Sequence, residues 1–172
     1  MNKDYEIVSL EYRVYQSFKG RYFIGHTPTL QLTNRSNAWG GLFNPSNSPI
    51  NLYFNTFTVT NYSSIPFSAK LWLNTSPIGN TMTSCNVSPA NTAFCPLPEP
   101  ESYLLYAQNV NCLPNDGVSI FTRIAEANST VVGNYYGKII IPPGGSIITY
   151  LQSTDSQLIN AEVAFGWWEE KK

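Results

Sequence analysis

The amino-acid sequence predicts an all-β fold, a single jelly-roll-like β-sandwich of about eight to ten strands. Short segments rich in β-branched and aromatic residues recur along the chain, and many of them alternate apolar with polar side chains, which is the period of a strand. Turn residues separate these segments, and no segment has the spacing of an amphipathic helix. A chain of 172 residues is long enough for one domain with a substantial core.

Residues 1–19 are predicted to form an N-terminal arm or edge strand ahead of a sandwich domain at residues 20–172. Its expected docking side chains alternate with polar ones and are Val8, Leu10, Tyr12 and Val14. The segment ends in polar residues and a glycine, which favours an edge position. It can pair with its own sheet, which is the simpler expectation, or with a neighbouring subunit by strand addition.

Two short strands are predicted at residues 21–24 and 29–33, and a loop rich in Asn, Gly, Ser and Pro follows at residues 34–49. This loop contains Trp39, Leu42 and Phe43. Because three large apolar side chains are unfavourable in water, we expect them to plug one end of the sandwich. An exposed aromatic contact surface is the alternative.

Residues 50–61 are predicted to form the central strand, because β-branched and aromatic residues dominate there. Regular alternation would place Tyr53, Phe57 and Val59 on one face, and Leu52, Phe54 and Thr58 on the other. Apolar side chains on both faces indicate a strand that is covered on both sides or that lies at an interface. After a turn at residues 61–64, the alternating segment 66–74 is expected to return antiparallel, as a hairpin.

Residues 76–102 are predicted to be a long insertion, since they hold five prolines and show little strand pattern beyond residues 81–87. The insertion contains Cys85 and Cys95, and Cys112 follows it. Cys85 and Cys95 could form a disulfide and leave Cys112 free or available to a neighbouring subunit. Three unpaired thiols are the alternative, expected for a protein in a reducing compartment.

The remaining strands are predicted where apolar residues cluster over the length of a strand. They are residues 103–108, 117–124, 131–132 together with 138–141, 147–151 and 159–169. Turn residues join them, notably Asn-Asp-Gly at 115–117 and Pro-Pro-Gly-Gly at 142–145. In the last strand, Ala161, Val163, Phe165 and Trp167 share one face.

The surface chemistry excludes several classes of protein. Charged residues make up only 12% of the chain, the net charge is −1, and no Lys/Arg run is present, so we expect no nucleic-acid partner. No stretch approaches the roughly 18 apolar residues of a membrane span, and residues 1–6 lack the apolar region of a secretory signal. A location at the spore surface or in an extracellular assembly, reached without a signal peptide, reconciles these features; a cytoplasmic or virion protein is the alternative.

The sequence offers no catalytic or metal-binding motif. His26 is the only histidine, and no nucleophile signature surrounds it, so we expect a structural or surface histidine. The three aspartates are scattered, and the cysteine spacing fits no zinc module. We therefore expect no enzyme activity and no cofactor.

Four blocks carry a resemblance to a known family: YFIGHT at 22–27, NAWGGLFNP at 37–45, PPGGS at 142–146 and AFGWWE at 164–169. Together they resemble an uncharacterised family of proteins of about this length from spore-forming Bacillus and Clostridium relatives, over nearly the whole chain. The general plan also looks like the jelly-roll subunits of endospore appendages. Those subunits carry cysteines in the arm that cross-link neighbours, whereas residues 1–19 here contain none.

Two functional hypotheses follow. The first is a self-assembling structural subunit of a spore-surface or fibre-like extracellular assembly, in which the arm and an edge strand join copies by strand addition. The second is a carbohydrate- or receptor-binding module of a phage or spore surface, in which exposed Trp39, Trp72 and Trp168 would stack on a glycan.

Overall fold

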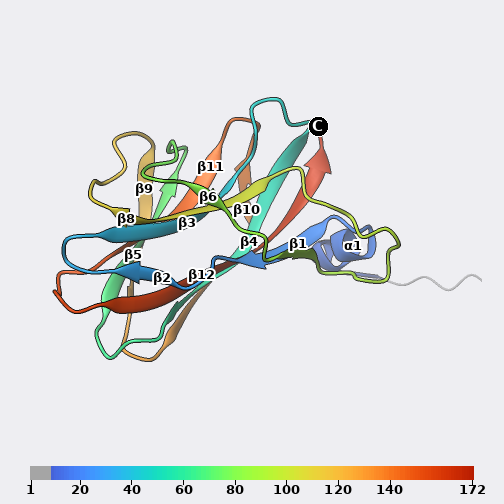
Figure 1. The fold of residues 1–172 in the computed structure, drawn as a ribbon. Helices are drawn as coiled ribbons and strands as arrows, with labels where there is room; N and C mark the ends of the chain where they lie inside the picture. Colours follow the sequence, from blue (N-terminus) through green and yellow to red (C-terminus); the bar gives the residue numbers. More distant parts are fainter. Residues whose placement is uncertain (1–8) are drawn as a thin grey trace, which may run out of the picture.

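Two antiparallel sheets pack face to face in the computed structural model, which describes residues 9–172 (Figure 1). The first sheet has the order β10-β4-β12-β1-β7, and β2 also pairs with β12. Its strands are β1 (Tyr22–His26), β2 (Leu30–Leu32), β4 (Ile50–Asn61), β7 (Val87–Pro89), β10 (Thr130–Ile141) and β12 (Ile159–Lys171). The second sheet has the order β6-β8-β3-β11-β5-β9. Its strands are β3 (Asn37–Phe43), β5 (Phe67–Leu73), β6 (Met82–Thr83), β8 (Tyr103–Val110), β9 (Val118–Ala125) and β11 (Ser146–Gln152).

Eight of these strands form a jelly roll, which confirms the fold class expected from the sequence. Strands β1, β12, β4 and β10 lie side by side in the first sheet, and β3, β11, β5 and β9 lie side by side in the second. Among these eight, only β5 and β9 follow one another within the same sheet, so the chain otherwise passes from sheet to sheet at each step. Strand β3 was not expected, because its Gly-rich sequence resembles a loop.

The inward faces of the two sheets enclose one apolar core. The face of β12 predicted from the sequence is confirmed, since Ala161, Val163, Phe165 and Trp167 are all buried. Aromatic contacts link β12 to β4, where the ring of Phe54 lies 6.1 Å from that of Phe165. The tight packing of such rings makes this core sensitive to any shift of register.

Strand β4 has the predicted bounds, but its predicted faces are wrong. Phe54 pairs with Trp167 and Thr56 pairs with Gly166, so Asn55 is an extra residue, a β-bulge. The bulge reverses the alternation, and the buried apolar residues of β4 are Ile50, Leu52, Phe54, Phe57 and Val59. These buried apolar residues of β4 occupy even positions before the bulge and odd positions after it, yet all of them face the core. The strand is therefore not covered on both faces, as the sequence pattern had suggested.

The predicted hairpin between β4 and β5 does not form. Strand β4 pairs with β10 and β12, whereas β5 pairs with β9 and β11 in the other sheet. The turn after Asn61 therefore carries the chain across the sandwich. Asn61 fixes this crossing, because its buried Nδ2 donates to the carbonyl oxygens of Ile65, Ala125 and Glu126.

The N-terminal segment forms a helix in place of the predicted edge strand: α1 spans Tyr12–Phe18. Gln16, its buried residue, donates from Nε2 to Glu170 Oε1 at 3.0 Å, and the Tyr12 ring packs edge-on against Trp168. Gly20 then adopts a left-handed conformation, which suits a helix end. Both stabilising contacts come from the far end of the sequence.

The insertion at residues 76–102 crosses one open side of the sandwich. Its strand β6 pairs with β8 in the second sheet, and its strand β7 pairs with β1 in the first. Glu169 holds the end of the insertion, because its buried carboxylate accepts hydrogen bonds from the backbone N–H groups of Glu101 and Ser102 and from the Ser102 hydroxyl. The insertion is thus part of the folded sandwich.

Asp116 holds the start of the insertion and leads to a pH prediction. Its carboxylate accepts hydrogen bonds from the Ser76 hydroxyl and backbone N–H and from the Thr75 hydroxyl, and these bonds lower its pKa. A carboxyl with a lowered folded-state pKa stabilises the fold above its unfolded pKa and loses that effect as pH falls through the folded value. We expect Asp116→Asn to lower the melting temperature at pH 7, and the difference from the wild type to vanish well below about pH 4. Thermal melts at pH 7, 5, 4 and 3 test this; a constant difference would contradict it.

Candidate functional site

One side of the sandwich presents long edge strands. Within residues 9–172, the eight-residue β9 pairs only with β5 and the twelve-residue β10 pairs only with β4. The Phe121 ring of β9 lies 5.6 Å from the Tyr135 ring of β10, so the two edges lie together. Val118 and Ile124 on β9 are 62% and 55% exposed, and Val132 and Ile140 on β10 are also exposed. This β9/β10 edge is therefore apolar and unpaired.

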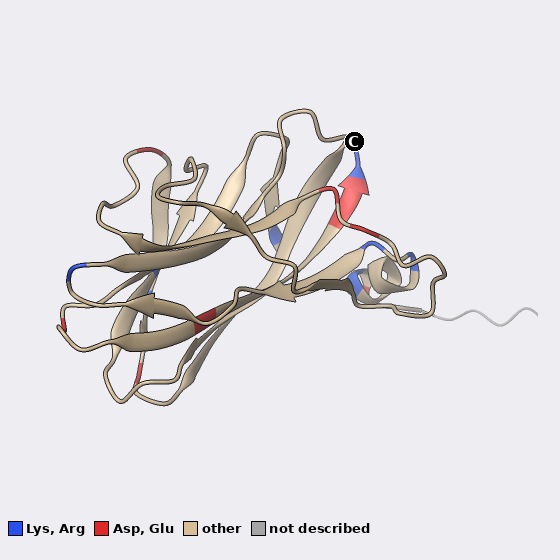
Figure 2. Cartoon of the chain, in the orientation of Figure 1, with Lys and Arg blue, Asp and Glu red and all other residues tan. Residues whose placement is uncertain are grey.

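The opposite side of the sandwich has only short edge strands within residues 9–172. There the edge strands are β6 and β7, which contain only two and three residues. Short strands offer few backbone groups to a further strand, which is a common protection of sheet edges. Figure 2 shows few charged residues on the strands of either sheet, so charge gives the β9/β10 edge little protection.

A groove of about 580 Å³ lies on the outer face of the first sheet. Cross-strand pairs explain its shape, because small side chains stand next to one another: Thr58 pairs with Ala164, Ala164 with His26, and Thr56 with Gly166. Larger side chains flank these residues. Glu162 lies at one end of the groove, and a row of three aromatic residues on neighbouring strands lies at the other: Tyr22, Trp168 and Tyr53. Residues 85–88 of the insertion line the groove beside β1.

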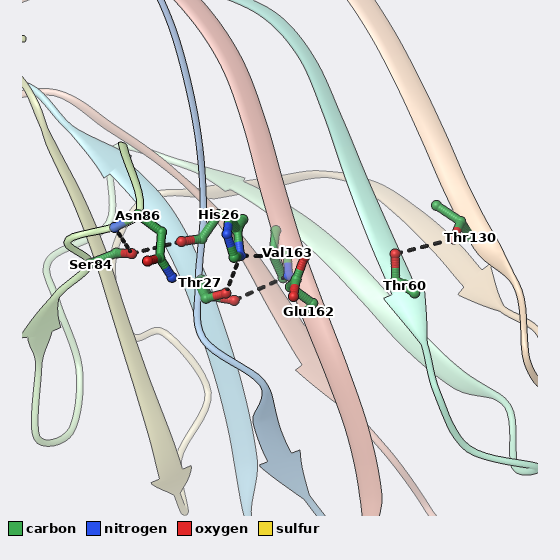
Figure 3. Close-up of polar contacts among 8 residues, drawn as sticks. All are labelled: His26, Thr27, Thr60, Ser84, Asn86, Thr130, Glu162 and Val163. Atoms are coloured by element: carbon green, nitrogen blue, oxygen red, sulfur yellow. Dashed lines mark hydrogen bonds and ion pairs between the residues drawn. The ribbon is translucent and has the colours of Figure 1, made fainter. Parts of the chain in front are cut away.

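His26 and Glu162 meet at one end of the groove (Figure 3). His26 Nδ1 lies 2.8 Å from the carbonyl oxygen of Thr27 and 3.4 Å from Glu162 Oε1. Because a carbonyl oxygen only accepts, Nδ1 carries the proton, and Nε2 of the neutral ring remains an acceptor. Partial burial and the nearby Glu162 carboxylate raise the pKa of the exposed Tyr62 hydroxyl.

An aromatic patch continues the same face beyond the groove. The Trp168 ring is stacked on Tyr53 at 5.2 Å and on Tyr22 at 6.5 Å. Beside it lies a second hollow, of about 250 Å³, lined by Glu11, Tyr12, Arg13, Tyr136 and Trp168. The Arg13 guanidinium stands 4.8 Å from the centre of the exposed Tyr136 ring. Several tyrosines, rather than tryptophans, are therefore the accessible aromatic groups here.

The exposed tryptophan surface predicted from the sequence does not form. Trp39 is 0% and Trp168 4% exposed, and Trp72 is half-buried. Trp39 does not plug an end of the sandwich either: it lies in a second apolar cluster, which includes Ile148 and Tyr150, and its Nε1 donates to the carbonyl oxygen of Ile78. The insertion supplies the cover that hides this side chain.

The disulfide that Cys85 and Cys95 could have formed is absent. Within residues 9–172, Cys85, Cys95 and Cys112 are exposed free thiols, in agreement with the alternative of unpaired cysteines. Cys85 lines the groove. Over the same residues, no group of three or more His, Cys, Asp or Glu side chains is placed to hold a metal ion.

The predicted docking side chains of the arm are only partly described. Val8 lies outside the described residues. Leu10 precedes α1, Tyr12 and Val14 lie on it, and all three side chains are exposed. In the part of the chain that the structure describes, no helix is both long and apolar enough to cross a membrane.

A family model for proteins of unknown function, DUF6143, matches residues 1–172. The chain belongs to DUF6143. The expectation of an uncharacterised family spanning the chain is therefore confirmed. No curated protein and no solved structure matches this DUF6143 chain. Its function must consequently be argued from the β9/β10 edge and the groove.

Sequence reasoning missed the groove of this DUF6143 protein, although one signal was present. The outward positions of β12 hold Ala164 and Gly166 between Glu162 and Trp168. Two small residues between tall ones on an exposed strand face indicate a local hollow. The partners on β1 and β4 could not be inferred, because the order of strands in the sheet was unknown.

Proposed function

We propose that this DUF6143 chain is a self-assembling structural subunit, whose copies join by strand addition at β9. In this proposal, residues 1–10 of one copy pair with the free edge of β9 in the next. The assembly is fibre-like and extracellular or lies at the spore surface, as for the endospore appendage subunits whose general plan the sequence resembles. The partner is a further copy of the same chain.

The single observation that carries this proposal is the contrast between the two sides of the sandwich. Strands β6 and β7 are too short to extend a sheet by much, whereas β9 offers eight residues and exposes Val118, Phe121 and Ile124. Long apolar edges are usually blunted in proteins that remain monomeric. Within residues 9–172, the side formed by β9 and β10 has two long strands that each pair on one side alone, which suits a specific strand addition.

The position of α1 favours the arm of a neighbouring copy as the added strand. Figure 1 shows α1 at one end of the molecule and β9 towards the other. Residues 1–10 precede α1 and include Ile7, Val8 and Leu10, apolar side chains that a strand could place against an edge. A contact between unlike surfaces repeats from copy to copy and generates a filament unless the rotation closes a ring.

The weak charge of the chain is consistent with close packing of identical copies. Only 12% of the residues are charged and the net charge is −1, so repulsion between copies is small. β9 itself carries one charged side chain, Arg123, whose guanidinium lies over the Phe121 ring.

Lysine substitutions at the edge test the assembly. We expect the purified wild type to form filaments or higher oligomers in negative-stain electron microscopy and light scattering, with and without reductant. Val118→Lys/Ile124→Lys should abolish them, because an added strand would have to bury two ammonium groups. A deletion of residues 1–10, which leaves α1 intact, should have the same effect, and circular dichroism should show both variants folded.

Leu158→Lys is the matched control, because Leu158 is an exposed apolar residue in a loop and should not affect assembly. A wild type that stays monomeric at millimolar concentration would refute the proposed function. Assembly that survives deletion of residues 1–10 but not the β9 substitutions would refute the arm as the added strand.

A further inference from the structure

The groove on the outer face of the first sheet has no part in the proposed assembly. It is lined by β1, β4, β12 and residues 85–88, whereas the assembly edge is formed by β9 and β10. Its volume of about 580 Å³ lies within the range of small-molecule sites, roughly 300–1,000 Å³. The groove is therefore large enough for a small ligand, and the proposed assembly does not account for it.

The floor of the groove is apolar but not aromatic. Ile24, Ala164 and Gly166 lie on its outward surface, next to Thr58 and to the methyl group of Thr56. Phe57 and Phe165 also belong to the lining, but both residues are buried in the core. Such a floor can receive the C–H face of a ligand.

Hydrogen-bonding groups stand around this floor without partners. Within residues 9–172, the Thr58 hydroxyl, the Asn86 side-chain amide and His26 Nε2 make no hydrogen bond. Glu162 adds a carboxylate, a group with the capacity to accept several hydrogen bonds. Together these groups offer donors and acceptors, with a single carboxylate and no lysine or arginine in the lining. This chemistry suits a neutral ligand that is rich in hydroxyl groups.

The backbone of the floor argues against an extended peptide. An added peptide strand needs free backbone N–H and C=O groups, which occur at sheet edges. The groove lies on the face of β1, β12 and β4, whose backbones are already paired with one another. A ligand there must be bound by side chains, as sugars are.

The aromatic patch supplies a second contact on the same face. Tyr22 separates the groove from this patch: its hydroxyl lies over Gly166, and its ring stacks with Trp168. The second hollow, with the exposed rings of Tyr12 and Tyr136, follows beyond Trp168. A chain of several sugar rings could therefore continue from the groove onto accessible tyrosine faces.

We propose that the outer face of the first sheet binds a neutral oligosaccharide. One sugar lies on Ala164 and Ile24 with its hydroxyl groups on Glu162, His26 and Asn86. Further sugars pass over Tyr22 and stack at Tyr136. The proposed site is independent of assembly at β9, so either can fail without the other.

Titration calorimetry with linear neutral tetrasaccharides tests the site, with cellotetraose, mannotetraose and fully N-acetylated chitotetraose as probes. We expect saturable binding of at least one probe to the full chain. Glu162→Gln should weaken it at least tenfold, since hydrogen bonds to a charged acceptor become weaker bonds to a neutral one and one oxygen acceptor is replaced by an NH₂ donor. Ala164→Phe should abolish it, because a ring on the floor fills the groove. The Val118→Lys/Ile124→Lys variant should bind as the wild type does.

Thr130→Phe is the matched control, because Thr130 lies on the same sheet face but outside the groove, next to Thr60 on β4. Its affinity should stay within twofold of the wild type. Tetragalacturonate and a neutral apolar tetrapeptide complete the set of probes. The proposal is overturned if no neutral tetrasaccharide binds, if Ala164→Phe binds as well as the wild type, or if the peptide or the anionic sugar binds more tightly.

Discussion

Deleting Asn55 should abolish cooperative folding of this DUF6143 chain, because the deletion removes the bulge that keeps both halves of β4 in register. Without the extra residue, either Leu52 and Phe54 or Phe57 and Val59 would turn to the outer face of the first sheet. Removing one buried phenylalanine side chain costs about 3–5 kcal/mol. Displacing two or more apolar residues therefore consumes most of the roughly 5–15 kcal/mol that stabilises a domain.

Asn55→Ala is the matched control, since it keeps the length of the strand. The Asn55 side chain donates from Nδ2 to the Tyr22 hydroxyl at 2.6 Å, and its Oδ1 is buried without a partner within residues 9–172. Losing this one hydrogen bond should cost about 1 kcal/mol. Urea unfolding followed by circular dichroism and tryptophan fluorescence measures both variants. If the deletion variant unfolded cooperatively with nearly wild-type stability, the bulge would not be required.

The same bulge explains why the sequence predicted β4 correctly but not its faces. Composition and length identify a strand, and both the start and the end of β4 agree with the structure. The assignment of faces assumes an uninterrupted period of two residues. An asparagine between Phe54 and Thr56 gives no local sign that it is unpaired, since the partners that reveal it lie on β10 and β12.

Long-range contacts also explain the two elements that were predicted wrongly. The alternation of Leu10, Tyr12 and Val14 suits a strand, but Gln16 binds Glu170, which is 154 residues away, and this contact favours α1. The segments of β4 and β5 look like a hairpin, but a jelly roll places them in opposite sheets. In both cases the local pattern of apolar and polar residues does not identify the distant segments that each element contacts.

The candidate sites were less predictable than the fold. The binding-module hypothesis required exposed Trp39 and Trp168, but the insertion covers the first and stacked tyrosines cover the second. The groove consists of small side chains from separate strands, so no continuous motif marks it. The edge at β9 follows from strand order, which a single sequence does not contain.

Glu169→Ala should be the most destabilising single substitution of a polar residue in this chain. The side chain is 5% exposed and accepts four hydrogen bonds: from the N–H groups of Glu101 and Ser102, the Ser102 hydroxyl and Trp167 Nε1. Each buried donor left without an acceptor costs about 1–3 kcal/mol, so the free energy of unfolding should fall by about 4 kcal/mol. Urea denaturation of the variant and of Glu99→Ala, an exposed carboxylate in the same insertion, measures the difference; the control should change it by less than about 0.5 kcal/mol.

Hydrogen exchange of single amides then separates a local from a global effect of Glu169→Ala. If Glu169 acts as the anchor of the insertion, the amides of Glu101 and Ser102 should lose more protection than those of Val163 and Phe165 in the centre of β12. An equal loss at all four amides would mean that the insertion unfolds only with the whole sandwich. Unchanged protection at Glu101 and Ser102 would show that Glu169 does not anchor the insertion. The insertion covers Trp39 and lines the groove. If Glu169 anchors the insertion, this residue at the end of β12 therefore also keeps Trp39 covered and the wall of the groove in place.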